Sequence, residues 1–189
     1  MIEITNLTKA FGDFTAVRDL SFGVQPGEVL GLVGPNGAGK TTTLRTMAGI
    51  IPPTSGAVRI DGYDISREPI KAKGQLAFFP DEPRLFDYLT VRQHLTFVAR
   101  LYGVQNHEAL AGPLLEELEI ANRIDHLPGD LSRGMKQKLA IACGLLHSPT
   151  VMAGPGRGLG PPPGPAGRSA GPADGSSHES LSRRRTGPA

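Results

Sequence analysis

Residues 34–42 read Gly-Pro-Asn-Gly-Ala-Gly-Lys-Thr-Thr and fill every fixed position of the pattern G-x-x-x-x-G-K-[ST]. This is the pattern of a loop whose backbone N–H groups hold phosphates. Its glycines let the backbone approach a phosphate without obstruction by Cβ atoms. The stretch therefore predicts a site for a nucleoside triphosphate, and the alternative is a glycine-rich turn that happens to end in Lys-Thr.

The sequence on both sides of the loop favours the phosphate site. Residues 29–33 are a short apolar run that predicts a buried strand, and residues 41–50 predict a helix. At a helix N-terminus, unpaired N–H groups and the helix dipole attract phosphate. Lys40 adds a cation, and the Thr41 hydroxyl can bind Mg²⁺. The residues expected to contact the nucleotide are Gly34, Pro35, Asn36, Gly37, Ala38, Gly39, Lys40, Thr41 and Thr42.

The end of the chain differs in composition from the rest. Residues 151–189 hold 9 of the 25 glycines and 7 of the 17 prolines, with few large apolar side chains. A segment with so little to bury cannot offset its ordering entropy. We therefore expect one domain over residues 1–152 and a disordered tail over residues 153–189.

Charge divides at nearly the same place. The first 150 residues carry a net charge of −1 and residues 151–189 carry +3, which gives the chain its net charge of +2. The first 150 residues thus show no excess of basic side chains that would bind nucleic acid. We therefore do not expect nucleic acid as a partner. No apolar stretch approaches the roughly 20 residues that span a bilayer, and the N-terminus lacks the form of a signal peptide, so a cytosolic body is expected.

Hydrophobic periodicity and turn residues predict the remaining elements. Strands are expected over residues 2–7, 16–24, 57–60 and 75–79, the first two in an antiparallel layer. Helices are expected over residues 91–102, 109–118 and 132–146, the first of them after the cap residue Thr90. The single cysteine, Cys143, lies in an apolar helical run and is expected to be a small core residue.

Residues 131–138 read Leu-Ser-Arg-Gly-Met-Lys-Gln-Lys at the start of the last of these helices. Ser132 is a natural N-cap there. With the phosphate loop about 90 residues earlier, this stretch resembles the signature Leu-Ser-Gly-Gly-Gln of the nucleotide-binding subunits of ABC transporters. The resemblance runs from residue 1 to about residue 150 and is strongest to subunits that serve small exporters.

This resemblance implies an α/β fold of the P-loop NTPase class, ABC type. It has an antiparallel β layer, a partial parallel sheet with flanking helices, and a helical subdomain over about residues 84–146, and it is expected to be incomplete at its C-terminus. In the family an aromatic residue near the N-terminus stacks on adenine, which assigns that role to Phe11, with a core position as the alternative. Asp81 stands where the family has a glutamine that reaches the metal-bound water, so it is a candidate Mg²⁺ ligand beside Thr41; an ordinary loop residue is the alternative.

The signature residues of the family contact the ATP of a second subunit. The resemblance gives this role to Ser132, Arg133, Gly134 and Met135, although Arg133 and Met135 depart from the usual Gly and Gln. It also implies ATP and Mg²⁺ as cofactors and a head-to-tail dimer with a second nucleotide-binding domain. A transmembrane permease would hold the protein at the inner face of the cell membrane.

The family's catalytic strand ends in Asp-Glu-Pro, but residues 153–157 here read Ala-Gly-Pro-Gly-Arg. The two catalytic carboxylates and the later histidine are therefore absent, and no catalytic residue is assigned. A shifted reading frame in a GC-rich gene would explain this change, and a genuine tail is the alternative. Three functions stay open: a transporter subunit, a non-hydrolytic regulatory module, and a non-functional fragment.

Overall fold

The computed structural model describes residues 1–154, which belong to one compact unit, Met1–Gly156. Apart from its first two residues, the tail expected over residues 153–189 lies outside the described residues. None of the described helices has the length and apolar character needed to cross a membrane.

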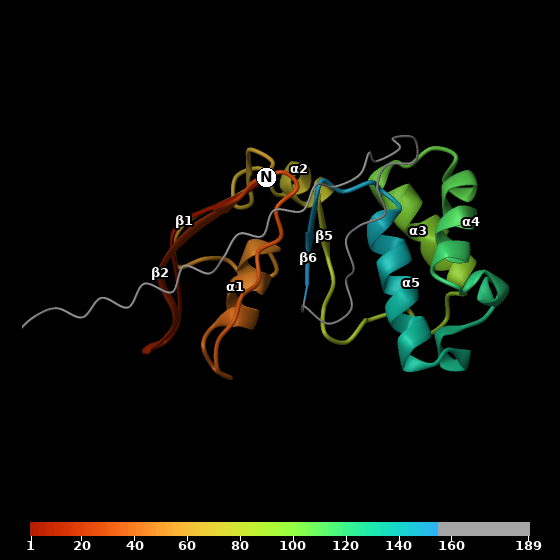
Figure 1. The fold of residues 1–189 in the computed structure, drawn as a ribbon, viewed down its shortest axis with the longest axis horizontal. Helices are drawn as coiled ribbons and strands as arrows, with labels where there is room; N and C mark the ends of the chain where they lie inside the picture. The colour runs from red at the N-terminus through yellow and green to blue at the C-terminus, as the bar shows by residue number, and fades with distance from the viewer. Residues whose placement is uncertain (155–189) are drawn as a thin grey trace, which may run out of the picture. The chain divides into compact units, whose positions relative to one another are not determined.

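A four-stranded antiparallel sheet opens the chain (Figure 1). Its strands, in spatial order, are β2 (Phe14–Val24), β1 (Ile2–Phe11), β3 (Ser55–Ile60) and β4 (Tyr63–Asp64). In the central strand β1, Ile2 lies opposite both Val24 of β2 and Ile60 of β3. The predicted antiparallel layer is confirmed, and β1 runs four residues beyond its predicted end at residue 7.

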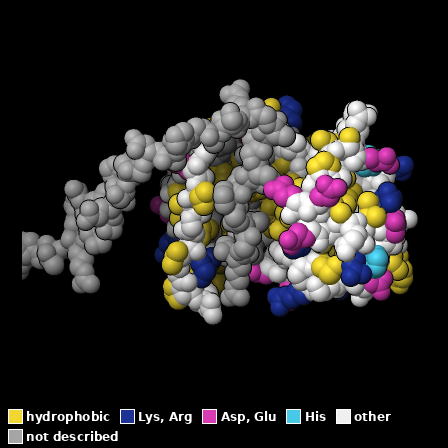
Figure 2. Space-filling model, turned by 45° about the vertical axis from the view of Figure 1, so that its right-hand side comes forward, with side chains coloured by type: hydrophobic (Ala, Val, Ile, Leu, Met, Phe, Trp, Pro, Cys, Tyr) yellow, Lys and Arg dark blue, Asp and Glu magenta, His cyan; other side chains and the backbone are white. Residues whose placement is uncertain are grey.

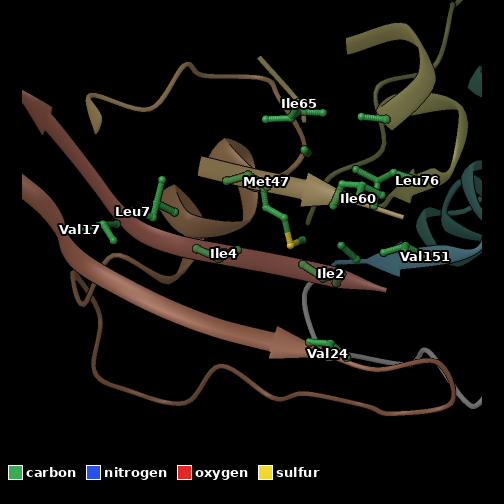
Figure 3. Packing of buried hydrophobic residues seen from close by; sticks show 14 residues of the cluster. Ile2, Ile4, Leu7, Val17, Val24, Met47, Ile60, Ile65, Leu76 and Val151 are labelled. Atoms are coloured by element: carbon green, nitrogen blue, oxygen red, sulfur yellow. The ribbon is translucent and has the colours of Figure 1, made fainter. Parts of the chain in front are cut away.

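Helix α1 (Lys40–Met47) packs on this sheet. Figure 3 shows Met47 pointing toward β1, between Ile4 and Ile60. Met47 belongs to a buried apolar cluster that also contains residues of the second sheet, Leu76 and Val151. The cluster buries the side chains that fix α1 against β1 and β3.

The second described sheet has two parallel strands, β5 (Leu76–Phe78) and β6 (Val151–Ala153), with Leu76 opposite Val151. A short helix that the sequence did not predict, α2 (Pro69–Gly74), precedes β5. Directly after β5, the Phe79 N–H donates to the Ala153 carbonyl at 2.8 Å. The pairing of β5 with β6 therefore brings together two segments that are about 75 residues apart in the sequence.

Three helices pack around a second buried cluster: α3 (Val91–Tyr102), α4 (His107–Glu117) and α5 (Arg133–Leu145). Two short 3-10 turns, Ala121–Arg123 and Pro128–Asp130, lie between α4 and α5. Figure 1 shows α5 between the two-stranded sheet and the helices α3 and α4. A Cβ atom on Gly144 would collide with the Phe79 ring, so a glycine there lets α5 approach the segment after β5.

The predicted strand over residues 29–33 is wrong. These residues form no strand, and Val29 and Val33 are 93% and 96% exposed. A strand is stabilised by ladder hydrogen bonds and side-chain packing with neighbours rather than by its own propensity. Among the described residues no strand pairs with this run. The larger sheet contains only β1 to β4, and β5 and β6 pair with each other.

Candidate functional site

The N-terminus of α1 presents unpaired hydrogen-bond donors. Its N-cap, Gly39, provides no side-chain cap, and the first turn contains no acidic residue. Within the described residues, the backbone N–H groups of Lys40, Thr41 and Thr42 have no hydrogen-bond partner. Free amides at the positive end of a helix dipole are the elements of an anion site.

The position of this helix start depends on Gly39. Its φ of 79° lies in the left-handed region, which side chains with a Cβ rarely adopt. A Cβ atom there would also collide with the Ala16 carbonyl of β2 and lie 3.1 Å from a Val17 methyl. Glycine thus allows the end of the phosphate loop to lie directly against the antiparallel sheet.

The Lys40 side chain turns back over the loop. Its ammonium donates to the carbonyl oxygens of Gly34 and Pro35, at 2.6 and 2.7 Å. Residues 34–38 are exposed, and Gly37 has a φ of 83°. The cation is therefore held within the loop by two neutral acceptors, which an anionic phosphate would outcompete as the stronger, charge-assisted partner.

The two candidate Mg²⁺ ligands, Thr41 and Asp81, are both exposed. No group of three or more His, Cys, Asp or Glu residues in the described part of the chain could hold a metal by itself. Mg²⁺ at nucleotide sites takes only one or two protein ligands and completes its shell with phosphate oxygens and water. The donors present fit a metal that arrives with a nucleotide.

Phe11 lies at the end of β1 and is 49% exposed. The interpretation of Phe11 as a core residue is therefore wrong. The Lys9 ammonium lies 4.8 Å from the centre of the Phe11 ring, so the ring has a cation on one side and is accessible to a flat ligand.

The signature stretch caps α5 as the sequence predicted. The Ser132 hydroxyl accepts from the Met135 N–H at 3.3 Å, and Arg133 and Gly134 are exposed. These residues lie at the start of α5, in the helical part of the chain.

A groove of about 660 Å³ lies beside β5, and the sequence did not predict it. Its lining residues come from α1, the β5 region, the following loop, α3 and α5. They are Arg45, Ile50, Leu76, Ala77, Phe78, Pro80, Pro83, Arg84, Leu85, Phe86, His94, Phe97, Val98, Leu101, Tyr102, Ala140, Cys143, Gly144 and His147. Because five separate segments form the groove, no local sequence pattern predicts it.

The groove is apolar with a positive electrostatic bias. Arg45 and Arg84 line it, and its lining contains no acidic side chain. Figure 2 shows hydrophobic side chains exposed between charged ones over the helical part of the molecule. Exposed apolar surface gathered along a groove indicates a site for a binding partner.

Two side chains of the groove are held in their neutral forms by burial. Burial raises the pKa of the Cys143 thiol to about 12, as expected for a packed cysteine rather than a nucleophile. His147 stacks on Tyr102 with ring centroids 3.9 Å apart, and burial lowers the pKa of its imidazole. The ends of α3 and α5 therefore meet through uncharged groups.

The family model described as "ABC transporter" matches residues 17–153. The chain belongs to the ABC transporter family. The "Probable multidrug ABC transporter ATP-binding protein YbhF" of Escherichia coli (strain K12) is 38% identical over 154 residues. That match covers 80% of this chain and 27% of YbhF.

Two solved structures share both sequence and fold with this ABC family member. One, titled "Structure of ATP binding subunit of ABC transporter", is 34% identical with a TM-score of 0.77, over 81% of this chain and 65% of that one. The other, cbiO1 of Clostridium perfringens, described as part of the ABC transporter complex cbiONQ, is 27% identical with a TM-score of 0.68, over 81% and 64%. The chain thus spans less than two thirds of the length of each of these relatives, while its P-loop fold of the ABC type is shared with both structures.

A pair of glycine substitutions tests how the loop is anchored. Gly39→Ala and Gly37→Ala both place a Cβ at a positive φ, a strain of about 1 kcal/mol or more. Only Gly39 is crowded, because a Cβ on Gly37 meets nothing within 4 Å. We expect Gly39→Ala to lower the free energy of unfolding in urea by about 1–3 kcal/mol more than Gly37→Ala. Equal losses would mean that the loop end does not pack on β2.

Proposed function

We propose that this chain binds MgATP through residues 34–42 as the nucleotide-binding part of an exporter-type ABC transporter. The observation that carries the proposal is the helix start at Lys40. There, within the described residues, three backbone N–H groups have no partner, the first turn of α1 carries no acidic residue, and the Lys40 ammonium is held by neutral carbonyls. This set of groups favours a polyphosphate over any uncharged ligand.

Each remaining site residue has a proposed role around the nucleotide. The exposed Phe11 ring stacks on the base, the Thr41 hydroxyl binds Mg²⁺, and Asp81 faces the same metal directly or through water. The amides of Gly37 and Gly39 complete the cradle for the phosphates, and that of Ala38 joins them if it leaves the Pro35 carbonyl, to which it donates at 3.2 Å. Mg²⁺, when bound, screens the phosphate charges and fixes their orientation.

A second copy of the nucleotide-binding domain completes the site in this proposal. Ser132, Arg133, Gly134 and Met135 at the start of α5 face the nucleotide of the partner in a head-to-tail dimer. The support is the exposure of Arg133 and Gly134 at the start of α5. The Arg133 guanidinium would add a charge-assisted contact to phosphate that a glycine cannot make.

Binding without hydrolysis is proposed for this sequence. Strand β6 ends at Ala153, and the next acidic residue in the sequence is Asp174. A water that attacks the terminal phosphate needs a group to orient and polarise it. Neither an acidic side chain nor a histidine follows β6 closely enough in sequence to take that place.

The groove is proposed to receive a helix from a transmembrane permease, which would hold the chain at the inner face of the cell membrane. Its apolar lining suits the apolar face of an amphipathic helix, read through anchors at successive turns. Arg45 and Arg84, without acidic neighbours in the lining, favour a helix that carries a carboxylate. The partner is therefore an amphipathic, acidic helix from a cytosolic loop of the permease.

A titration with fluorescent ATP and Mg²⁺ tests the nucleotide site. Lys40→Ala should lower affinity about thirtyfold, because about 2 kcal/mol is typical of a charge-assisted contact. Lys73→Ala, on the exposed surface of α2, is the matched control and should leave affinity unchanged. Phosphate release measured alongside should equal that of a protein-free blank. Equal affinity of Lys40→Ala and the unaltered chain would place the nucleotide elsewhere.

Binding to inside-out membrane vesicles from the cells that make the protein tests the groove. Phe97→Ala removes an aromatic side chain from the groove, and we expect binding to weaken about tenfold or more. Leu110→Ala, on the exposed surface of α4 and outside the groove, is the control. Protein-free liposomes of the same lipids should bind neither the unaltered chain nor these two variants. Vesicle binding that is indifferent to Phe97 would contradict docking in the groove.

A further inference from the structure

His94 on α3 is a buried histidine with two hydrogen bonds, only 3% exposed. Its Nε2 lies 2.9 Å from the Phe86 backbone N, and its Nδ1 lies 2.8 Å from the Thr90 carbonyl oxygen. The ring thus spans from the first turn of α3 to the loop that precedes it. Neither the phosphate site nor the signature uses this residue.

The two partners fix the protonation state of the ring. The Phe86 N–H can only donate, so Nε2 must supply a lone pair; the Thr90 carbonyl can only accept, so Nδ1 must carry the hydrogen. Only the neutral Nδ1–H tautomer satisfies both contacts. The imidazolium form, with hydrogen on both nitrogens, would leave the Phe86 N–H facing another donor.

One end of this connection is rigid. Thr90 caps α3 in a capping box: its hydroxyl accepts from the Gln93 N–H at 3.2 Å, and its N–H donates to Gln93 Oε1 at 2.8 Å. The Thr90 carbonyl also accepts the His94 backbone N–H at 2.9 Å. His94 therefore ties the loop to a fixed point.

The other end carries a wall of the groove. The Phe86 ring packs against the His94 ring, with centroids 5.9 Å apart, and edge-on against Phe97 at 5.2 Å. Phe86 is nevertheless 54% exposed and lines the groove beside His94 and Phe97. Its backbone N–H makes its hydrogen bond to His94, so His94 determines where this exposed ring stands.

We propose that His94, as the neutral Nδ1–H tautomer, is a positioning residue for the groove: it clamps the loop at Phe86 onto α3 and so preorganises the aromatic wall that receives the partner helix. This inference rests on the proposed docking role of the groove and not on the nucleotide site. Preorganisation strengthens binding because a loop that is already fixed loses less conformational freedom when the partner arrives.

The tautomer is measured directly on the unaltered chain. Long-range proton–nitrogen NMR spectra of ¹⁵N-histidine-labelled protein separate the protonated from the unprotonated nitrogen of each ring. We expect His94 at neutral pH to show hydrogen on Nδ1 and a lone pair on Nε2. An Nε2–H tautomer or a charged ring would overturn the clamp.

The position of Phe86 is measured in a Phe86→Trp background, because the chain contains no other tryptophan. Adding His94→Leu should raise acrylamide quenching of that tryptophan roughly twofold or more, since a lost buried hydrogen bond favours the open loop. His94→Gln keeps an acceptor and should stay closer to the parent. His107→Leu is the control, because His107 bonds Thr96 on α3 outside the groove. Unchanged quenching in folded His94→Leu rejects the clamp.

The functional arm compares vesicle binding with ATP binding. His94→Leu should weaken vesicle binding several-fold, His94→Gln should restore most of it, and both should bind fluorescent ATP like the unaltered chain. Equal vesicle binding by all three rejects His94 as a positioning residue. No vesicle binding by the unaltered chain rejects docking itself, which separates that failure from failure of the clamp. If His94→Leu does not fold, the tautomer and His94→Gln decide.

Discussion

The close approach of Gly39 to the backbone of Ala16 is the constraint on which the phosphate site depends. It lets α1 begin directly against β2, and the amides of its first turn have no hydrogen-bond partner among the described residues. Seven residues later, Met47 enters the apolar cluster of the sheet and fixes the other end of the helix. The donors for phosphate are therefore held by the antiparallel sheet, while Val29, Leu30 and Val33 of the preceding run lie exposed.

Local signals predicted the elements that are stabilised locally. The start of α3 follows from Thr90 and Gln93, whose side chains and backbones cap each other within four residues. The start of α5 follows from Ser132, whose hydroxyl accepts from the Met135 N–H. The antiparallel layer follows from turn residues at 12–13, which close the hairpin of β1 and β2.

The features that depend on distant partners could not be predicted in this way. The apolar run at residues 29–33 has the composition of a strand, but only a neighbouring strand could make it one. His94 looks in the sequence like an ordinary helical residue, since its role requires the Phe86 loop to fold back over it. The groove combines α1, β5, a loop, α3 and α5, whose meeting depends on the whole fold.

Helix α1 joins the two proposed sites. It carries Lys40 at the phosphate end and Arg45, five residues later, in the groove. A rigid-body shift of this helix would move both side chains together. The proposed nucleotide and partner sites therefore lie near opposite ends of one short helix. The phosphate loop before this helix, residues 34–39, is the segment expected to become ordered around the nucleotide.

Amide hydrogen exchange over residues 25–42, with and without MgATP, tests whether the nucleotide binds at the start of α1. We predict fast exchange over residues 29–37 in the free protein, because this segment is exposed except at the half-buried Leu32 and forms no ladder. MgATP should then protect the amides of residues 36–42 most strongly, because these N–H groups are the ones proposed to bind phosphate. Nucleotide binding that leaves exchange across residues 34–42 unchanged, and protects a different part of the chain, would contradict the account.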